Sequence, residues 1–262
     1  LPLLMGKRMK INTLLIANRG EIACRIAKTV RALGITPVAV HSEADRTARH
    51  VREIGRSILI GAGPASESYL NIAAVLEAAK RNGADAIHPG YGFLSENPDF
   101  ARAVEAAGMI FVGPTAETLE RFGDKASAKE AAIAANIPVI SGSPGALSDP
   151  DAIQAEVLQM GLPVLLKAVG GGGGRGQRLV SDKATLTADI EGALREARST
   201  FGSEGLILER FLDHARHVEI QIIGDGDGKV LHLFERDCTL QRRHQKVIEE
   251  APAFGLPREL VD

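Results

Sequence analysis

The sequence has little of several features that mark specialised protein classes. Only 4% of its 262 residues are aromatic, and its two cysteines, Cys24 and Cys238, lie far apart without the spacing of a metal site. This composition argues against a disulfide scaffold and against a surface that stacks on nucleic-acid bases. The net charge is only −2, so the chain has no excess of positive charge for binding a polyanion. We therefore expect no nucleic-acid partner.

Long hydrophobic runs are also missing. No run approaches the length of a membrane span, and the first residues, LPLLMGKRMK, lack the apolar core and cleavage site of a secretory signal. We therefore expect a soluble protein with no membrane partner and, by default, a cytoplasmic location. Because 45% of the residues are hydrophobic, the chain can bury a core.

Short apolar runs alternate with helical patterns in the first half of the chain. Strands are predicted over 13–17, 36–42, 84–90 and 108–114, and helices over 21–34, 69–83 and 98–108. This alternation predicts a parallel sheet with helices on both faces. Ligands of such sheets bind at the carboxyl ends of the strands, where this sequence carries NRGE, HSEAD, HPGYGFLSEN and VGPT. Turn and capping chemistry explains HPGYGFLSEN equally well, and in NRGE we expect Arg19 to pair with Glu21.

The pattern changes after about Phe122. A helical linker is predicted over 124–139, then strands over 162–168, 177–180 and 205–212 with a long helix from about Asp182 to Thr200. The stretch 217–237 predicts an antiparallel hairpin, because its apolar alternation is broken by the turn-rich GDGDGK. The second half is therefore expected to be a small mixed lobe followed by the start of a third unit.

The stretch KAVGGGGGRGQR at 167–178 is the most unusual in the chain. Five glycines leave the backbone amides open to an anion, and Lys167 and Arg175 add positive charge, so phosphate is the expected ligand. The spacing is that of neither a P-loop nor a GxGxxG turn, and a loop between two strands fits a flap that closes over a nucleotide. The alternative is a mobile linker. We favour the flap, because a lysine at the end of an apolar strand is costly to place without an anionic partner.

The run ERDCTLQRRHQK is the densest polar segment. A charged run of this kind is most often a solvated face. On an extended segment, however, alternate side chains share a face, so that one row holds Gln241, Arg243 and Gln245 and the other Arg242, His244 and Lys246. The second row would present three potential cations to one site.

Five stretches together resemble a known family. In order they are LLIANRGEIACRI, HPGYGFLSEN, GDKASAK, PVLLKAVGGGGGRGQRLV and ERDCTLQRRHQKVIEEAPA, and they resemble the biotin carboxylase component of biotin-dependent carboxylases, which belongs to the ATP-grasp superfamily. The resemblance runs from about Asn12 to the last residue. It implies an α/β, three-lobed ATP-grasp fold: a parallel-sheet, Rossmann-like N-terminal domain over 11–122, a helical linker over 123–138, a small lid domain over 139–211, and a truncated C-terminal α+β domain over 212–262.

The resemblance also implies an activity. The family consists of ATP-dependent ligases that carboxylate biotin on a carrier protein with bicarbonate, through carboxyphosphate. This is the first half-reaction in carboxylating methylcrotonyl-, geranyl-, propionyl- or acetyl-CoA, or pyruvate. The implied cofactors are ATP, Mg²⁺ and biotin, and the implied partners are bicarbonate, a biotin carboxyl carrier, a carboxyltransferase subunit, and further copies in a homodimer or hetero-oligomer.

The family's ligand-binding positions fall on particular residues of this chain. Those on the nucleotide phosphates are Lys125, Lys167, Gly173 and Gly174. The positions that bind adenine are Glu209, Arg210, Phe211 and Leu212. The further nucleotide contacts are His217, Gln241 and His244. Lys246 holds bicarbonate, so Lys246 and His244 are the catalytic candidates, and no metal ligand is assigned within the chain.

Some family features are changed or missing. Gln177 stands where methionine is common, and IGRSI replaces a usual Ala-Asp-Glu-Ala turn before the strand at 57–60. The magnesium-binding glutamates, the general base and the biotin-accepting AMKM-like motif are absent, so Mg²⁺ ligands and biotin are expected outside this chain. We expect these residues to bind ATP without completing the reaction. The alternatives are another ATP-grasp ligase, such as a carbamoyl-phosphate synthetase or a purine-pathway carboxylase, and a non-catalytic nucleotide sensor.

Overall fold

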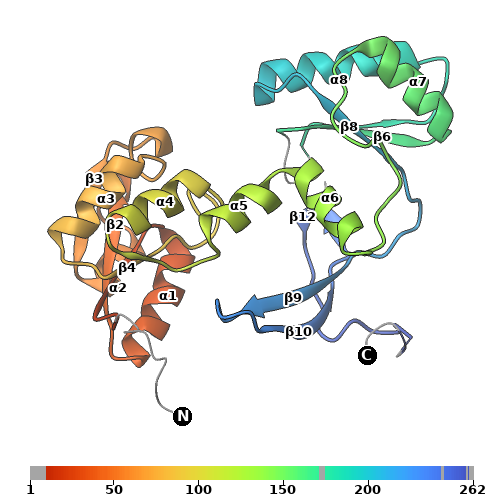
Figure 1. The fold of residues 1–262 in the computed structure, drawn as a ribbon. Helices are drawn as coiled ribbons and strands as arrows, with labels where there is room; N and C mark the ends of the chain where they lie inside the picture. The colour runs from red at the N-terminus through yellow and green to blue at the C-terminus, as the bar shows by residue number, and fades with distance from the viewer. Residues whose placement is uncertain (1–9, 171–174, 243–244, 258, 260–262) are drawn as a thin grey trace. The chain divides into compact units, whose positions relative to one another are not determined.

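The computed structural model describes residues 10–170, 175–242, 245–257 and 259, apart from the side chain of Lys125 (Figure 1). The chain forms two compact units, and the boundary between them in the sequence falls between Ala128 and Lys129. None of the described helices has both the length and the apolar character needed to cross a membrane.

The first unit is built on a parallel sheet of five strands in the order β3-β2-β1-β4-β5. The strands are β1 (Thr13–Ile16), β2 (Thr36–Ser42), β3 (Ser57–Gly61), β4 (Ala86–His88) and β5 (Ile110–Phe111). The predicted parallel sheet is therefore confirmed. Most residues of β1, β2 and β4 are buried, as expected of a sheet covered on both faces, whereas the edge strand β3 is mostly half-buried or exposed.

Successive strand residues point to opposite faces of this sheet, and both sets of positions are apolar. Helices therefore pack on both faces. Leu15 and Val38 pack with residues of α3 (Ile72–Arg81) and α4 (Pro98–Ala106), whereas Leu14 and Ile16 pack with α1 (Gly20–Ala32). The sequence predicted these three helices from their periodicity. It did not predict α2 (Arg49–Ile54) or α5 (Ala116–Gly123), which are too short to show a period, nor the single turns Glu43–Asp45 and Ala65–Glu67. Helix α6 (Lys125–Ala134) follows, and the Asp124 carboxylate caps it by accepting from the Ser127 N–H at 2.8 Å.

The second unit contains an antiparallel sheet in the order β7-β6-β8. Its strands are β6 (Val164–Ala168), β7 (Gln177–Val180) and β8 (Leu206–Arg210), and α7 (Pro150–Met160) and α8 (Leu186–Phe201) pack on one face. The sequence did not predict α7, of which only Ile153 and Val157 are buried. Helix α8 starts later than Asp182, because the Asp182 carboxylate and carbonyl accept from the next residues and form a turn there.

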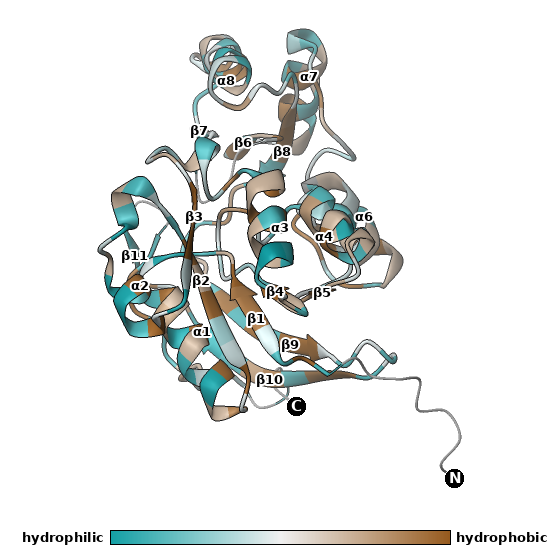
Figure 2. Ribbon diagram, turned by 90° about the vertical axis from the view of Figure 1, so that its left-hand side faces the viewer, coloured by the Kyte–Doolittle hydropathy of each residue, from teal (hydrophilic) through white to brown (hydrophobic). Residues whose placement is uncertain are grey.

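A hairpin of β9 (Val218–Gly224) and β10 (Val230–Asp237) confirms the predicted pairing at 217–237. The Asp225 carboxylate forms its turn by accepting from the N–H groups of Asp227 and Lys229. Hydrophobic residues run along both strands (Figure 2), and many of them are exposed, including Ile222 and Leu231. Two short strands, β11 (Gln241–Arg242) and β12 (Gln245–Lys246), pair antiparallel beyond it.

Candidate functional site

The sheet of the second unit has one buried face and one open face. On β6, Val164, Leu166 and Ala168 are buried against the helices. Lys167 points the other way by strand alternation, and on β8 Glu209 does the same. The open face therefore carries two of the predicted nucleotide-binding residues on adjacent strands.

Lys167 and Glu209 form an ion pair on this open face. Each side chain is about one fifth exposed, so the pair lies at the surface but is partly shielded from water. The carboxylate supplies the anionic partner that the sequence argument required for Lys167. The position of Lys167 at the end of an apolar strand therefore does not by itself demand an external anion.

The glycine stretch connects β6 to β7, as predicted for a flap between two strands. Gly173 and Gly174 lie outside the described residues, so their predicted phosphate contacts are not tested. At the end of the loop the Arg175 guanidinium lies 6.0 Å from the centre of the Phe201 ring. Gly176 has a φ of +70°, and a side chain there would clash with the same ring, which explains the glycine.

The end of β8 and the two residues after it contain the remaining adenine candidates. The N–H of Arg210 donates to the Ser141 carbonyl at 2.8 Å, and that of Phe211 donates to Pro163 at 3.1 Å. The side chains of Arg210 and Leu212 are exposed. The backbone in this segment is thus held by residues 141 and 163, while the side chains remain open to solvent.

Lys246 belongs to a second polar group, built around Glu219 of β9. The Glu219 carboxylate pairs with both Lys246 and Arg236. The hydrogen bond from Lys246, together with that from Arg236, holds the pKa of Glu219 at about 2, and the same bond raises the pKa of Lys246. Sequence reasoning did not single out Glu219. The signal in the sequence that could have identified it is a carboxylate between the apolar residues Val218 and Ile220 of a predicted strand.

His217 and Gln241 lie next to each other beside this group. The Gln241 side-chain amide donates to Nδ1 of His217 at 2.7 Å and to the Cys238 carbonyl at 2.8 Å. Because an amide nitrogen only donates, Nδ1 accepts and the imidazole proton lies on Nε2. The structure therefore brings together two of the predicted nucleotide contacts.

The predicted alternation along 241–246 is wrong. The segment does not run straight: β11 and β12 fold back on each other, pairing Gln241 with Lys246 and Arg242 with Gln245. Directly paired residues share a face, so Gln241 and Lys246 lie on the same face rather than on opposite ones. His244 and Arg243 lie outside the described residues, as does the side chain of Lys125.

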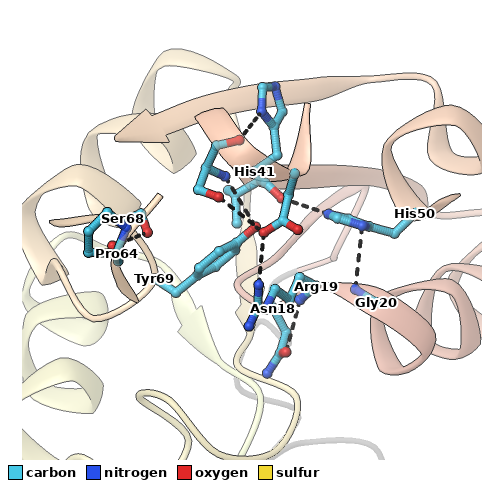
Figure 3. Close-up of polar contacts among 11 residues, drawn as sticks. Asn18, Arg19, Gly20, His41, His50, Pro64, Ser68 and Tyr69 are labelled. Atoms are coloured by element: carbon cyan, nitrogen blue, oxygen red, sulfur yellow. Dashed lines mark hydrogen bonds and ion pairs between the residues drawn. The ribbon is translucent and has the colours of Figure 1, made fainter. Parts of the chain in front are cut away.

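The first unit has a separate polar cluster at the carboxyl ends of β1 and β2 (Figure 3). Arg19 pairs with Asp45 at 3.2 Å and lies over the rings of Tyr69 and Phe93. The predicted pairing of Arg19 with Glu21 is therefore wrong. The Tyr69 hydroxyl donates to Asp45 at 2.7 Å, and burial together with this bond raises the pKa of Tyr69 to about 12.

A buried histidine completes this cluster. His50 Nε2 lies 3.1 Å from the Val40 carbonyl, and the Gly20 N–H at the start of α1 donates to Nδ1 at 3.4 Å. Burial lowers the pKa of His50, which fits a neutral ring. These contacts join the start of α1 to β2 and α2, which is a structural role.

Comparison with known protein families divides the chain in two. Residues 10–119 match the family "Biotin carboxylase, N-terminal domain". Residues 124–262 match "Carbamoyl-phosphate synthase L chain, ATP binding domain".

Individual proteins resemble most of the chain. A biotin carboxylase of Pseudomonas aeruginosa is 51% identical over 247 residues, which cover 94% of this chain and 55% of that protein. The mitochondrial methylcrotonoyl-CoA carboxylase subunit alpha of Oryza sativa subsp. japonica is 49% identical over 243 residues, 93% of this chain and 33% of that subunit. The chain therefore spans about half, or less, of the length of these relatives.

A solved structure has a similar fold. The biotin carboxylase domain dimer of Hydrogenobacter thermophilus 2-oxoglutarate carboxylase, in complex with MgADP, ADP and bicarbonate, gives a TM-score of 0.92 at 43% identity. The match covers 97% of this chain and 56% of that domain.

Proposed function

The chain belongs to the biotin carboxylase family of ATP-grasp proteins, and from that premise we propose that it supplies the ATP-binding part of an enzyme that carboxylates biotin. ATP phosphorylates bicarbonate, which gives carboxyphosphate and ADP. Carboxyphosphate breaks down to CO₂ and phosphate, and the biotin ureido nitrogen loses its proton as it bonds to the CO₂ carbon. Catalysis of this kind rests mainly on positioning and on neutralising charge.

The observation that carries the proposal is the open face of the β6–β8 sheet. Lys167 stands there at the end of β6, directly before the glycine loop, and is held by Glu209. A relative 43% identical to 97% of this chain has been crystallised with MgADP and bicarbonate. We propose that nucleotide phosphates compete with Glu209 for Lys167, with Lys125, Gly173 and Gly174 completing the phosphate site.

The other nucleotide contacts are proposed along the same unit. Glu209, Arg210, Phe211 and Leu212 would hold the adenine. His217, Gln241 and His244 would contact the nucleotide further along. His217 is suited to this because its Nε2–H is left to donate when Nδ1 accepts from Gln241.

Lys246 is the proposed bicarbonate ligand, with His244 as the second catalytic candidate. Its ammonium is fixed by Glu219, which also raises the pKa of Lys246 and so keeps it charged. A fixed, charged ammonium is suited to an anionic substrate. We infer that Glu219 sets the position from which Lys246 meets bicarbonate.

Mg²⁺ is not placed among these residues. The group Glu219, Cys238 and Glu249 brings its ligand atoms within 4.8 Å of one another. Glu219, however, is already paired with two cations, and a thiol is a poor ligand for a hard cation. This group therefore does not fit Mg²⁺.

The final acceptor stays open between acyl-CoA esters and keto acids. We propose an acyl-CoA, since a methylcrotonoyl-CoA carboxylase subunit is 49% identical to most of this chain. With it we propose as partners a biotin carboxyl carrier and a carboxyltransferase subunit, and assembly into a homodimer or hetero-oligomer.

We keep the proposed domain division at 11–122, 123–138, 139–211 and 212–262. The cytoplasmic location is also a proposal, which fractionation of cells would test.

The proposal is tested by ADP formation that depends on both biotin and bicarbonate. In the protein purified from its native source, we expect such turnover, and Lys246→Ala in the same polypeptide should lower it at least about a hundredfold, as removal of one key electrostatic group does. Exposed Lys183, changed to Ala, is the matched control and should leave turnover unchanged. Turnover with ammonia or an aminoimidazole ribotide in place of biotin would favour the other ATP-grasp ligases. Turnover indifferent to Lys246→Ala would contradict the assignment.

A further inference from the structure

Lys129 on α6 carries a buried ammonium group that has no hydrogen-bond partner among the described residues. Its Nζ is shielded from solvent, and no hydrogen-bond acceptor among the described residues lies within reach of it. A buried ammonium is costly in free energy unless an acceptor pairs with it. The missing acceptor therefore calls for an explanation.

The surroundings of Lys129 are set by an isolated antiparallel bridge between Gly142 and Glu209. Residues paired in this way direct their side chains to the same face. Gly142 has no side chain, and a Cβ built on it would lie 3.0 Å from Lys129 Nζ and 3.1 Å from the Cα of Glu209. That Cβ would come nearer still to the Leu208 carbonyl oxygen, so the Lys129 ammonium lies beside Gly142 and the backbone of Glu209.

This position completes a row of charges on the open face of the sheet. Glu209 lies between Lys129 on one side and Lys167 on the other, and its carboxylate is paired with Lys167. Lys125, expected on the phosphates, stands one turn before Lys129 on the same helix. The unpartnered ammonium thus lies among the residues to which the nucleotide has been assigned.

We propose that Lys129 is a third lysine of the nucleotide site, whose ammonium donates a hydrogen bond to an acceptor on the nucleoside part of the ligand. The inference rests on the proposed function, because Glu209 is the residue expected at the adenine. Lys167 is paired across the sheet with Ile207, whereas Gly142, beside Lys129, is paired with Glu209, two residues further along β8 towards the adenine candidates at 210–212. This register puts Lys129 at the base and ribose end, whereas Lys125 and Lys167 serve the phosphates. The bound nucleotide then supplies the acceptor that the described residues do not provide.

The test compares Lys129→Met with Lys167→Met in the purified protein, using ATP, ADP and AMP as ligands. We expect Lys129→Met to weaken all three by the same factor, about tenfold, the effect of one charge-assisted hydrogen bond. Lys167→Met should weaken ATP more than AMP, because its partner is a phosphate. Lys129→Arg should restore part of the affinity, and Lys183→Met, on an exposed surface, should change nothing.

Thermal unfolding separates this role from a structural one. Lys129→Met should unfold at the same temperature as the parent protein or higher, because it removes an unpaired buried charge while keeping the apolar length. A lower unfolding temperature with unchanged affinity would overturn the inference. If the parent binds ATP through Lys167 and Lys129→Met binds equally well, the inference alone fails. If the parent binds no nucleotide, the proposed function fails with it.

Discussion

At the scale of single residues, Glu219 shows what a sequence hides. It lies on β9, 27 positions before Lys246, and only the folding of 241–246 into two short strands brings the two together. The alternation of residues along one strand does not indicate which residue of another strand will pair with Glu219. Lys246 itself was identified because a motif carries it, and its role as a bicarbonate ligand stays a prediction.

Glu219 also makes a testable contribution to stability. Its pKa lies at about 2 in the folded protein against an ordinary 4.5, first because Lys246 donates to it. A carboxyl with a depressed pKa stabilises the fold fully above its unfolded value, and that contribution is lost as the pH falls from about 4.5 towards 2. Glu219→Gln should therefore lose less stability over this range than the parent does.

Urea unfolding at fixed pH values between about 7 and 3 measures this difference. Glu204→Gln, at an exposed position, is the control and should follow the parent. Parallel pH profiles for Glu219→Gln and the parent would show that the ion pairs with Lys246 and Arg236 do not stabilise the fold.

At the scale of elements, the sequence was informative where periodicity was strong. Strands β1, β2, β4 and β5 and helices α1, α3 and α4 were predicted because apolar residues recur along them. Helix α7 was missed, since only Ile153 and Val157 mark its buried face. The fold-back at 241–246 was missed because its register depends on cross-strand pairing, which alternation cannot reveal.

The pairing of residues 141–143 with β8 depends on one glycine. The N–H of Ser143 donates to the Leu208 carbonyl at 2.9 Å, and a Cβ at Gly142 would clash with that same oxygen. We expect Gly142→Ala to destabilise the second unit by about 1–3 kcal/mol, the usual cost of forcing extra atoms into a packed site. Thermal or urea unfolding measures this.

Gly145 offers a matched control three residues further on, because a Cβ there would meet nothing within 4 Å. Gly145→Ala should leave stability within about 0.5 kcal/mol of the parent, as surface substitutions do. If both variants unfold alike, the close approach of residue 142 to β8 is not the reason for its glycine.

At the scale of the whole molecule, the family was predictable and the site only in part. Five ordered motifs pointed to biotin carboxylase, and the matches over 10–119 and 124–262 confirm it. Gly173, Gly174 and His244 lie outside the described part of the chain, and their roles stay predictions. The exposed apolar residues along β9 and β10 form a surface that the sequence did not predict. Alternation of apolar residues along these strands predicts that one face is buried.

The central claim is that Lys167, before the glycine loop, meets the phosphates of ATP. An acyl-phosphate derivative of ATP tests it most directly, because the reagent transfers its acyl group to a lysine amine beside the bound phosphates. Mass spectrometry of the labelled protein should find the acyl group on Lys167, and excess ATP should prevent the labelling. Labelling that ATP suppresses on other lysines, with Lys167 unmodified, would contradict the account.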